Sequence, residues 1–163
     1  MVRHSLALVA LFAVSANAQS PDIRGVWKPV EVVVTAGPDS GTHTSDMQPG
    51  LFIFTDRHYS TTYVDGFAVR PMMSASPTDE ERVRIWRPFV GSAGTYVVKD
   101  SMLSVTAAVA KNPAAMSGRT STVQVRVLAD SLWLIVREAG SAKEAGGIER
   151  RMKCVRMERF PSK

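Results

Sequence analysis

Short runs of alternating apolar and polar residues, separated by turn-forming residues, constrain the fold of this chain more than any other feature. Alternation of this kind has the period of a β-strand with one face in a core and the other in solvent. The expected strands span residues 27–35, 51–54, 59–65, 95–99, 102–110, 119–128, 132–137 and 148–158. Most connections between them are short, so strands that are neighbours in sequence should pair as antiparallel hairpins.

Eight antiparallel strands in this order can close on themselves, which removes the exposed edges of the sheet. The sequence therefore predicts an all-β fold, an eight-stranded antiparallel up-and-down barrel. The one long connection near the start, residues 36–50, is expected to be a polar loop rich in Gly, Pro, Asp and Ser. The interior of a barrel of this size is either filled by side chains or holds one small ligand.

One segment, residues 73–89, departs from the alternation and has helical signals. Thr78 and Glu81 have the spacing of a capping box, and Pro88 should end the helix near residue 87. Three apolar residues recur at helical spacing, namely Val83, Trp86 and Val90. We therefore expect one helix between strands 3 and 4 of the predicted order, with the Gly-containing residues 91–94 as its stop signal.

The start of the chain has the pattern of a secretory signal peptide. Within residues 1–18, the basic Arg3 precedes an apolar run at 6–14 and a small-x-small site at 16–18. Cleavage after residue 18 would leave a single domain, residues 19–163, in a secreted or periplasmic protein. The alternative is an N-terminal membrane anchor, but the apolar run is 9 residues long, which is too short to span a bilayer.

Charge and cysteine content limit the expected partners. Without Arg3 the chain has 19 basic and 15 acidic residues, a mild excess of about +4. The basic run at 150–159 alternates with apolar residues as a strand does, so we expect no nucleic-acid partner. No later segment is apolar for long enough to give stable membrane insertion. Cys154 is the only cysteine, so no internal disulfide forms, and its apolar neighbours indicate a buried, inert thiol.

Residue patterns typical of metal or cofactor sites are missing from the sequence. His43 and His58 are the two histidines that follow the leader, and they lie in separate loops. No H-x-x-x-H, C-x-x-C, phosphate-binding loop or G-x-S-x-G elbow occurs. We therefore predict no metal site and no cofactor.

Aromatic, methionine and arginine residues at inward or mouth positions are the candidate ligand-binding residues. Tyr59, Thr61 and Tyr63 share one face of an expected strand. This row would either line a cavity with hydroxyl groups or form a cross-strand row that stiffens the sheet. The predicted ligand-binding residues are Tyr59, Tyr63, Arg70, Met72, Trp86 and Tyr96.

Three sequence pieces occur together in the order and spacing of a known family. They are Gly25-x-Trp27, the hairpin G-L-F-I-F-T-D-R-H-Y-S, and the helix that runs into F-V-G-S-A-G-T-Y-V-V-K-D-S-M-L-S-V. Over residues 22–158 the chain resembles the bacterial lipocalin-like domain family of the lipocalin superfamily. Unlike a typical secreted lipocalin, it has neither disulfides nor a long C-terminal helix.

The resemblance implies a cup-shaped barrel whose closed end is plugged by Trp27. In lipocalins this tryptophan stacks with an arginine of the last strand, and Arg156 is the expected partner here. Gly25 would let the backbone pass close beneath the plug. Gly25, Trp27 and Arg156 are therefore the predicted barrel-closing residues.

The favoured function is binding of a small, mostly apolar molecule in the barrel. One alternative is a cofactor-free isomerase, cyclase or hydrolase that uses the same cavity. It would need an inward acid or base such as Glu149, Asp65 or a tyrosine, although Glu149 could instead pair with Arg137 on the rim or surface. The other alternative is a structural or interaction protein, monomer or homodimer, with Trp133 and Ile135 as an outer dimer patch.

Overall fold

The computed structural model describes residues 20–37, 39–45, 47–66, 68–138 and 147–161. Its strands are β1 Gly25–Ala36, β2 His43–Thr44, β3 Gly50–Phe54, β4 His58–Val64, β5 Phe89–Lys99, β6 Met102–Ala110, β7 Thr120–Leu128, β8 Ser131–Glu138 and β9 Ile148–Glu158. The α-helix α1 spans Asp79–Trp86, and a short 3-10 helix, η1, spans Pro113–Met116. The predicted leader, residues 1–18, lies outside the described residues.

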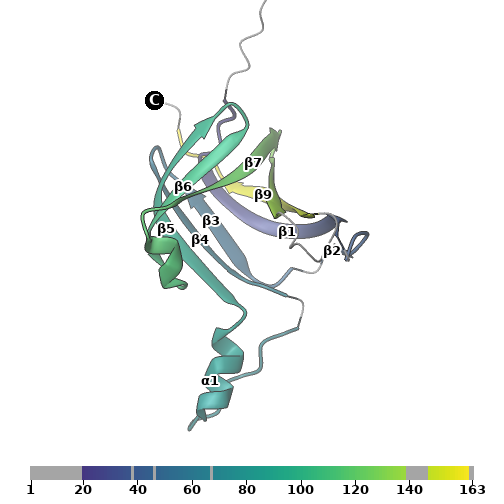
Figure 1. Cartoon of the computed structure of the whole chain (residues 1–163), viewed down its shortest axis with the longest axis vertical. Helices are drawn as coiled ribbons and strands as arrows, with labels where there is room; N and C mark the ends of the chain where they lie inside the picture. The colour runs from purple at the N-terminus through teal and green to yellow at the C-terminus, as the bar shows by residue number, and fades with distance from the viewer. Residues whose placement is uncertain (1–19, 38, 46, 67, 139–146, 162–163) are drawn as a thin grey trace, which may run out of the picture.

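The strands form one closed antiparallel barrel (Figure 1). From β3 to β9 each strand pairs with the next, and β9 returns to pair with β1. β1 also closes the ring on its other side, because Gly25 and Trp27 pair with Phe54 and Phe52 of β3. The predicted all-β class and the predicted closed barrel of eight antiparallel strands are confirmed.

The predicted place of the helix among the strands is wrong. The helix was expected between strands 3 and 4, but α1 follows β4, because the connection after β1 holds an additional two-residue strand, β2. β2 pairs with β1 at Val32 and Val33. The start of α1 is as predicted: Thr78 is the N-cap, and Thr78 and Glu81 form the capping box. α1 extends away from the barrel beyond the ends of β4 and β5 (Figure 1).

Strand β5 begins earlier than predicted and includes residues 91–94, which we interpreted as a helix stop signal. It pairs with β4 from Val64 opposite Phe89 to His58 opposite Thr95, so the small residues continue the ladder. A bulge against β6 follows Ala93. At the next residue, Gly94, an added Cβ would lie 2.1 Å from the Thr106 carbonyl oxygen. The glycine is therefore a site of close strand approach rather than a helix end.

The core lies at the end of the barrel where β1 begins and β9 ends, which we call the closed end. Its most deeply buried side chains are Ile23, Trp27, Phe54, Val125, Leu132 and Cys154. Cys154 is free and buried, and this burial raises the pKa of its thiol to about 12. The thiol therefore stays protonated at neutral pH and contributes packing rather than reactivity.

Candidate functional site

Trp27 is the centre of the closed end. Its side chain is fully buried, and its indole Nε1 donates a hydrogen bond to the Ile23 carbonyl oxygen at 2.7 Å. The guanidinium carbon of Arg156 lies 3.8 Å from the centroid of the indole ring. Arg156 also donates from Nη1 to the Arg24 carbonyl oxygen at 2.6 Å. The indole and the guanidinium together fill this end of the barrel and hold the start of β1 against β9.

Gly25 allows this close approach. It has a φ of +129°, and an added Cβ would lie 2.3 Å from the Glu158 carbonyl oxygen and 3.0 Å from Arg156 Nη1. Any side chain would therefore push β1 away from β9 and disturb the arginine that covers Trp27.

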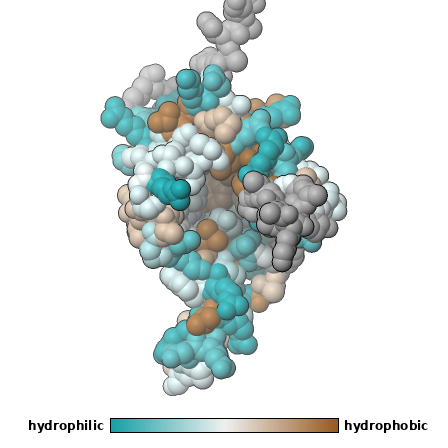
Figure 2. All heavy atoms as spheres, in the orientation of Figure 1, coloured by the Kyte–Doolittle hydropathy of each residue, from teal (hydrophilic) through white to brown (hydrophobic). Residues whose placement is uncertain are grey.

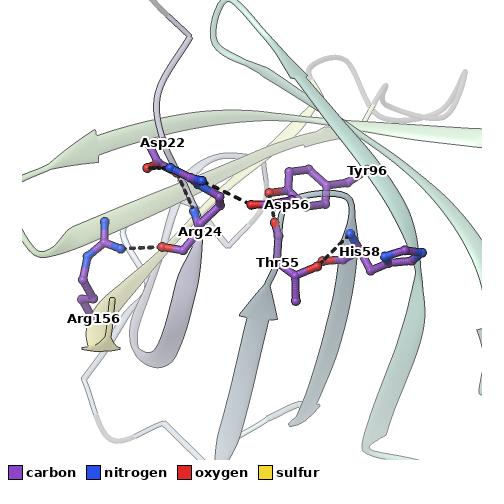
Figure 3. Close-up of polar contacts among 7 residues, drawn as sticks. All are labelled: Asp22, Arg24, Thr55, Asp56, His58, Tyr96 and Arg156. Atoms are coloured by element: carbon purple, nitrogen blue, oxygen red, sulfur yellow. Dashed lines mark hydrogen bonds and ion pairs between the residues drawn. The ribbon is translucent and has the colours of Figure 1, made fainter. Parts of the chain in front are cut away.

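The polar groups around the closed end are paired with one another (Figure 3). Arg24 forms ion pairs with Asp22 at 2.7 Å and with Asp56 at 3.2 Å. The hydrogen bond from Arg24 lowers the pKa of Asp22 to about 2. Tyr96 donates its hydroxyl to the Thr55 carbonyl oxygen at 2.6 Å, and burial raises the pKa of Tyr96 to about 12. These contacts tie the start of β1 to the β3–β4 turn and to β5, while the buried Arg156 Nε has no hydrogen-bond partner among the described residues and lies 3.5 Å from Asp130 Oδ1.

Beyond the core the inner face is not filled, and a cavity of about 220 Å³ remains inside the barrel. One wall, from β3, β4 and β5, is aromatic and hydroxylic and consists of Phe52, Phe54, Tyr59, Thr61, Tyr63 and Ser92. The opposite wall, from β6 to β9, is aliphatic and consists of Leu103, Val105, Val123, Leu134, Val136 and Met152. Figure 2 shows that the face in view is hollowed near its centre, with hydrophobic residues beside the hollow.

The row of Tyr59, Thr61 and Tyr63 lines this cavity, and Tyr63 also packs across the strand pair against Phe52, so the row has features of both interpretations. The Tyr59 hydroxyl and Ser92 Oγ are 2.7 Å apart and share a hydrogen bond. The Tyr63 ring packs edge-on against Phe52, with ring centroids 5.7 Å apart. Burial raises the pKa of the Tyr63 hydroxyl, which is therefore a neutral donor at physiological pH.

A second hollow has a more polar lining. It lies at the end of the barrel opposite the closed end, which we call the mouth. The lining includes Val32 and Val34 of β1, Asp65 just after β4, and Arg150 of β9. Asp65 raises the pKa of Tyr63 and Arg150 lowers it, so both charges act on the tyrosine hydroxyl. Tyr63 is therefore a cavity-lining residue whose hydroxyl pKa depends on the charged groups at the mouth.

Arg70, Met72 and Trp86 do not line the barrel cavity. Met72 is 94% exposed, and Arg70 is exposed on the connection that precedes α1. Trp86 is 59% exposed on α1, where the Lys111 amino group lies 5.4 Å from its ring centroid. Lys111 also donates to the carbonyl oxygens of Trp86 and Arg87, both at 2.7 Å. These contacts fix the end of α1 outside the barrel. Of the six predicted ligand-binding residues, Tyr59 and Tyr63 line the cavity.

Glu149 is not an inward base. It accepts hydrogen bonds from Thr35 Oγ1 at 2.7 Å, Arg137 Nε at 2.6 Å and Arg151 Nε at 2.8 Å. These bonds lower its pKa to about 2. The pairing with Arg137, which the sequence left open, is therefore the arrangement that the structure has.

The candidate dimer patch is partly covered within the chain. Trp133 and Ile135 are half-buried on β8. The Lys153 amino group lies 5.5 Å from the centroid of the Trp133 ring. This contact gives Trp133 an intramolecular neighbour on the outer face.

Several lining residues were missed from the sequence. Ser92 was missed because residues 91–94 were interpreted as the end of the helix. The alternation of Phe52 and Phe54 in a short apolar strand was the signal that could have placed them on the inner wall. Within the described ranges, no three metal-binding side chains gather at one place. No helix in this described part is long and apolar enough to cross a membrane.

Comparison of the chain with protein-family models, with curated proteins and with solved structures gave no match in any of the three. The class that the geometry defines is a closed antiparallel β-barrel with one filled end and an internal, mostly apolar cavity.

Proposed function

We propose that this chain is an exported, lipocalin-like barrel that binds a small, mostly apolar molecule in its internal cavity. The observation that carries the proposal is the cavity of about 220 Å³ between an aromatic wall and an aliphatic wall. The family resemblance of the motifs, the contact between Trp27 and Arg156 and the leader pattern at residues 1–18 also support it.

The size of the cavity limits the ligand. A dry apolar cavity of about 150 Å³ is enough to bind benzene. A ligand of one ring with a short substituent would therefore suit the space here. Burial of about 150 Å² of apolar ligand surface would contribute about 4 kcal/mol before the cost of association is subtracted. Hydrogen bonds to the hydroxyl wall would add affinity and fix the orientation.

Titration with a naphthalene-sized fluorescent probe tests this function. We expect saturable uptake at one site per chain, with a blue shift of the probe emission. Val123→Phe, which places a larger ring in the cavity, should weaken this uptake by about tenfold or more because the space is lost. The matched control is Val97→Phe, because Val97 is 65% exposed, and it should leave uptake within about twofold. Equal uptake by both variants, or binding by the wild type of neither this probe nor an apolar one-ring probe, would contradict the proposal.

A further inference from the structure

The two walls of the cavity differ in chemistry, and neither carries a charged side chain. Hydroxyl groups are confined to one wall, on β4 and β5, and face aliphatic side chains from β6 to β9. A ligand that fits both walls needs an apolar body and a polar edge. A bare hydrocarbon would leave the hydroxyl wall without partners. An anionic group would be buried among uncharged lining residues, and at the Tyr63 hydroxyl the effect of Asp65, which disfavours a negative charge, exceeds that of Arg150.

The hydroxyls of the wall are not equally available to a ligand. Tyr59 and Ser92 already share a hydrogen bond at 2.7 Å. Thr61 Oγ1 points to the Ser92 carbonyl oxygen at the longer distance of 3.4 Å. Tyr63 is partly buried, and among the described residues its hydroxyl has no hydrogen-bond partner. A half-buried phenol without a partner gains most from an acceptor that enters with the ligand.

The Tyr63 ring is held in one position, so its hydroxyl can select a ligand by where the acceptor atom lies. Its edge-on packing against Phe52 fixes the plane of the ring on the cavity wall. Gly50, opposite Tyr63 across the strand pair, leaves no room for a Cβ, which would lie 2.7 Å from Tyr63 Cβ. The Gly50 backbone therefore packs directly against the Tyr63 Cβ, and this contact limits movement of the tyrosine side chain.

We propose that the ligand is a neutral molecule of one ring that carries a carbonyl oxygen, and that this oxygen accepts a hydrogen bond from the Tyr63 hydroxyl. The inference rests on the proposed function and deepens it, since it names the chemical class that the cavity selects. The phenol is held in its neutral, donating form, because burial disfavours the phenolate. The aliphatic wall contacts the ring, and the hydroxyl wall contacts the oxygen.

Three probes of nearly equal shape test this inference. Acetophenone carries the carbonyl, α-methylstyrene replaces that oxygen by a methylene group, and benzoate replaces the neutral ketone by a carboxylate. Calorimetric titration of each should show that Tyr63→Phe weakens acetophenone binding by about fivefold to tenfold. The same variant should leave α-methylstyrene binding within about twofold. Benzoate should bind the wild type at least about tenfold more weakly than acetophenone, because the cavity holds no cation.

Tyr96→Phe is the matched control. Its hydroxyl donates to the Thr55 carbonyl oxygen at the closed end and does not line the cavity. It should leave the affinity for acetophenone and α-methylstyrene within about twofold. A second readout is the ¹³C shift of carbonyl-labelled acetophenone, which a hydrogen bond moves downfield. This downfield displacement should appear in the wild type and in Tyr96→Phe and be absent in Tyr63→Phe.

The outcomes separate this inference from the proposed function. If Tyr63→Phe leaves the affinity for acetophenone unchanged while both neutral probes bind, the hydrogen bond is overturned and apolar binding stands. If benzoate binds more tightly than acetophenone, or if the naphthalene-sized probe binds and all three smaller probes do not, the neutral one-ring class is overturned. If no apolar probe of either size binds the wild type, both proposals fail.

Discussion

The closed end and the mouth half of the barrel are made by the same strands with the same alternation, and yet one is solid and the other is hollow. Along β7, Val125 is 1% exposed in the core, whereas Val123, on the same face, lines the cavity. Along β9, Cys154 is fully buried and Met152 lines the cavity. The alternation of residues along a strand therefore determines which side chains face the interior. It does not determine whether side chains from opposite walls touch.

Side-chain size accounts for the difference. At the closed end the large side chains of Trp27 and Phe54 are buried, and the Arg156 guanidinium covers the indole from the neighbouring strand β9. Beyond them the aliphatic wall is made largely of valine and leucine, which are too short to reach the tyrosine row. Because the buried side chains of the closed end hold the same strands together, we expect this end to keep the hollow half in shape. The difference between the two halves therefore predicts that substitutions in the closed end affect stability more than substitutions in the cavity.

Removal of the plug should have the largest effect on stability. Trp27→Ala deletes a fully buried indole together with its hydrogen bond to the Ile23 carbonyl oxygen, and should lower the free energy of unfolding by roughly 3–5 kcal/mol. Trp133→Ala deletes an indole that is half-buried on the outer face and should cost less than about 2 kcal/mol. Guanidinium denaturation followed by circular dichroism measures both. Equal losses in the two variants would mean that the closed end does not dominate stability.

Substituting phenylalanine for each of two inward valines on β7 should have a smaller effect on stability. The two variants compare the closed end with the hollow half directly. Val125→Phe overpacks the core and should destabilise the fold by about 1–3 kcal/mol. Val123→Phe points the same ring into the cavity and should change stability by less than about 1 kcal/mol, because the added atoms enter free space. Thermal and chemical unfolding of the two variants gives the comparison. A loss as large at Val123 as at Val125 would show that the cavity closes in solution.

The strands and the ring closure were predictable from sequence, because the alternation and the short turns are local signals. The start of β5 was not, since Gly91 and Gly94 look like a helix end until the ladder with β4 is known. β2 is also set by pairing, because its two residues have no periodicity to detect and depend on β1. Tertiary pairing overrode local propensity in both places.

The candidate site divides in the same way. The inward face of Tyr59 and Tyr63 followed from period two, and Arg156 was placed over Trp27 by the resemblance, which is the contact that the structure has. Trp86, on α1, and Met72, on the connection before it, were predicted as ligand-binding residues, and both are exposed outside the barrel. No pattern in the sequence indicates how far a helix lies from a barrel, so whether residues on α1 and before it line the cavity could not be predicted.

The smallest expected effect concerns one ion-paired carboxylate in each half, Asp22 at the closed end and Glu149 in the hollow half, and it depends on pH. Hydrogen bonds lower the pKa of Glu149 from 4.5 to about 2, and that of Asp22, at the closed end, from 3.8 to about 2. A carboxyl group whose pKa falls on folding stabilises the fold above its unfolded pKa, and this contribution is lost as pH falls through the interval between the two values. Both contributions should therefore be complete above about pH 5 and lost towards pH 2.

Glu149→Gln and Asp22→Asn remove these contributions one at a time. Each variant should be slightly less stable than the wild type at pH 6, and the difference should shrink between about pH 4.5 and pH 2. High salt should reduce both differences, because the ion pairs with Arg137 and Arg24 are solvent-accessible. Urea denaturation across this pH range measures the differences. Since Glu149 bonds to Thr35 of β1 and Arg137 of β8, its loss should also loosen probe binding in the hollow half, which the loss of Asp22 should not do. A difference from the wild type that stays constant with pH would show that neither carboxylate is held as the structure has it.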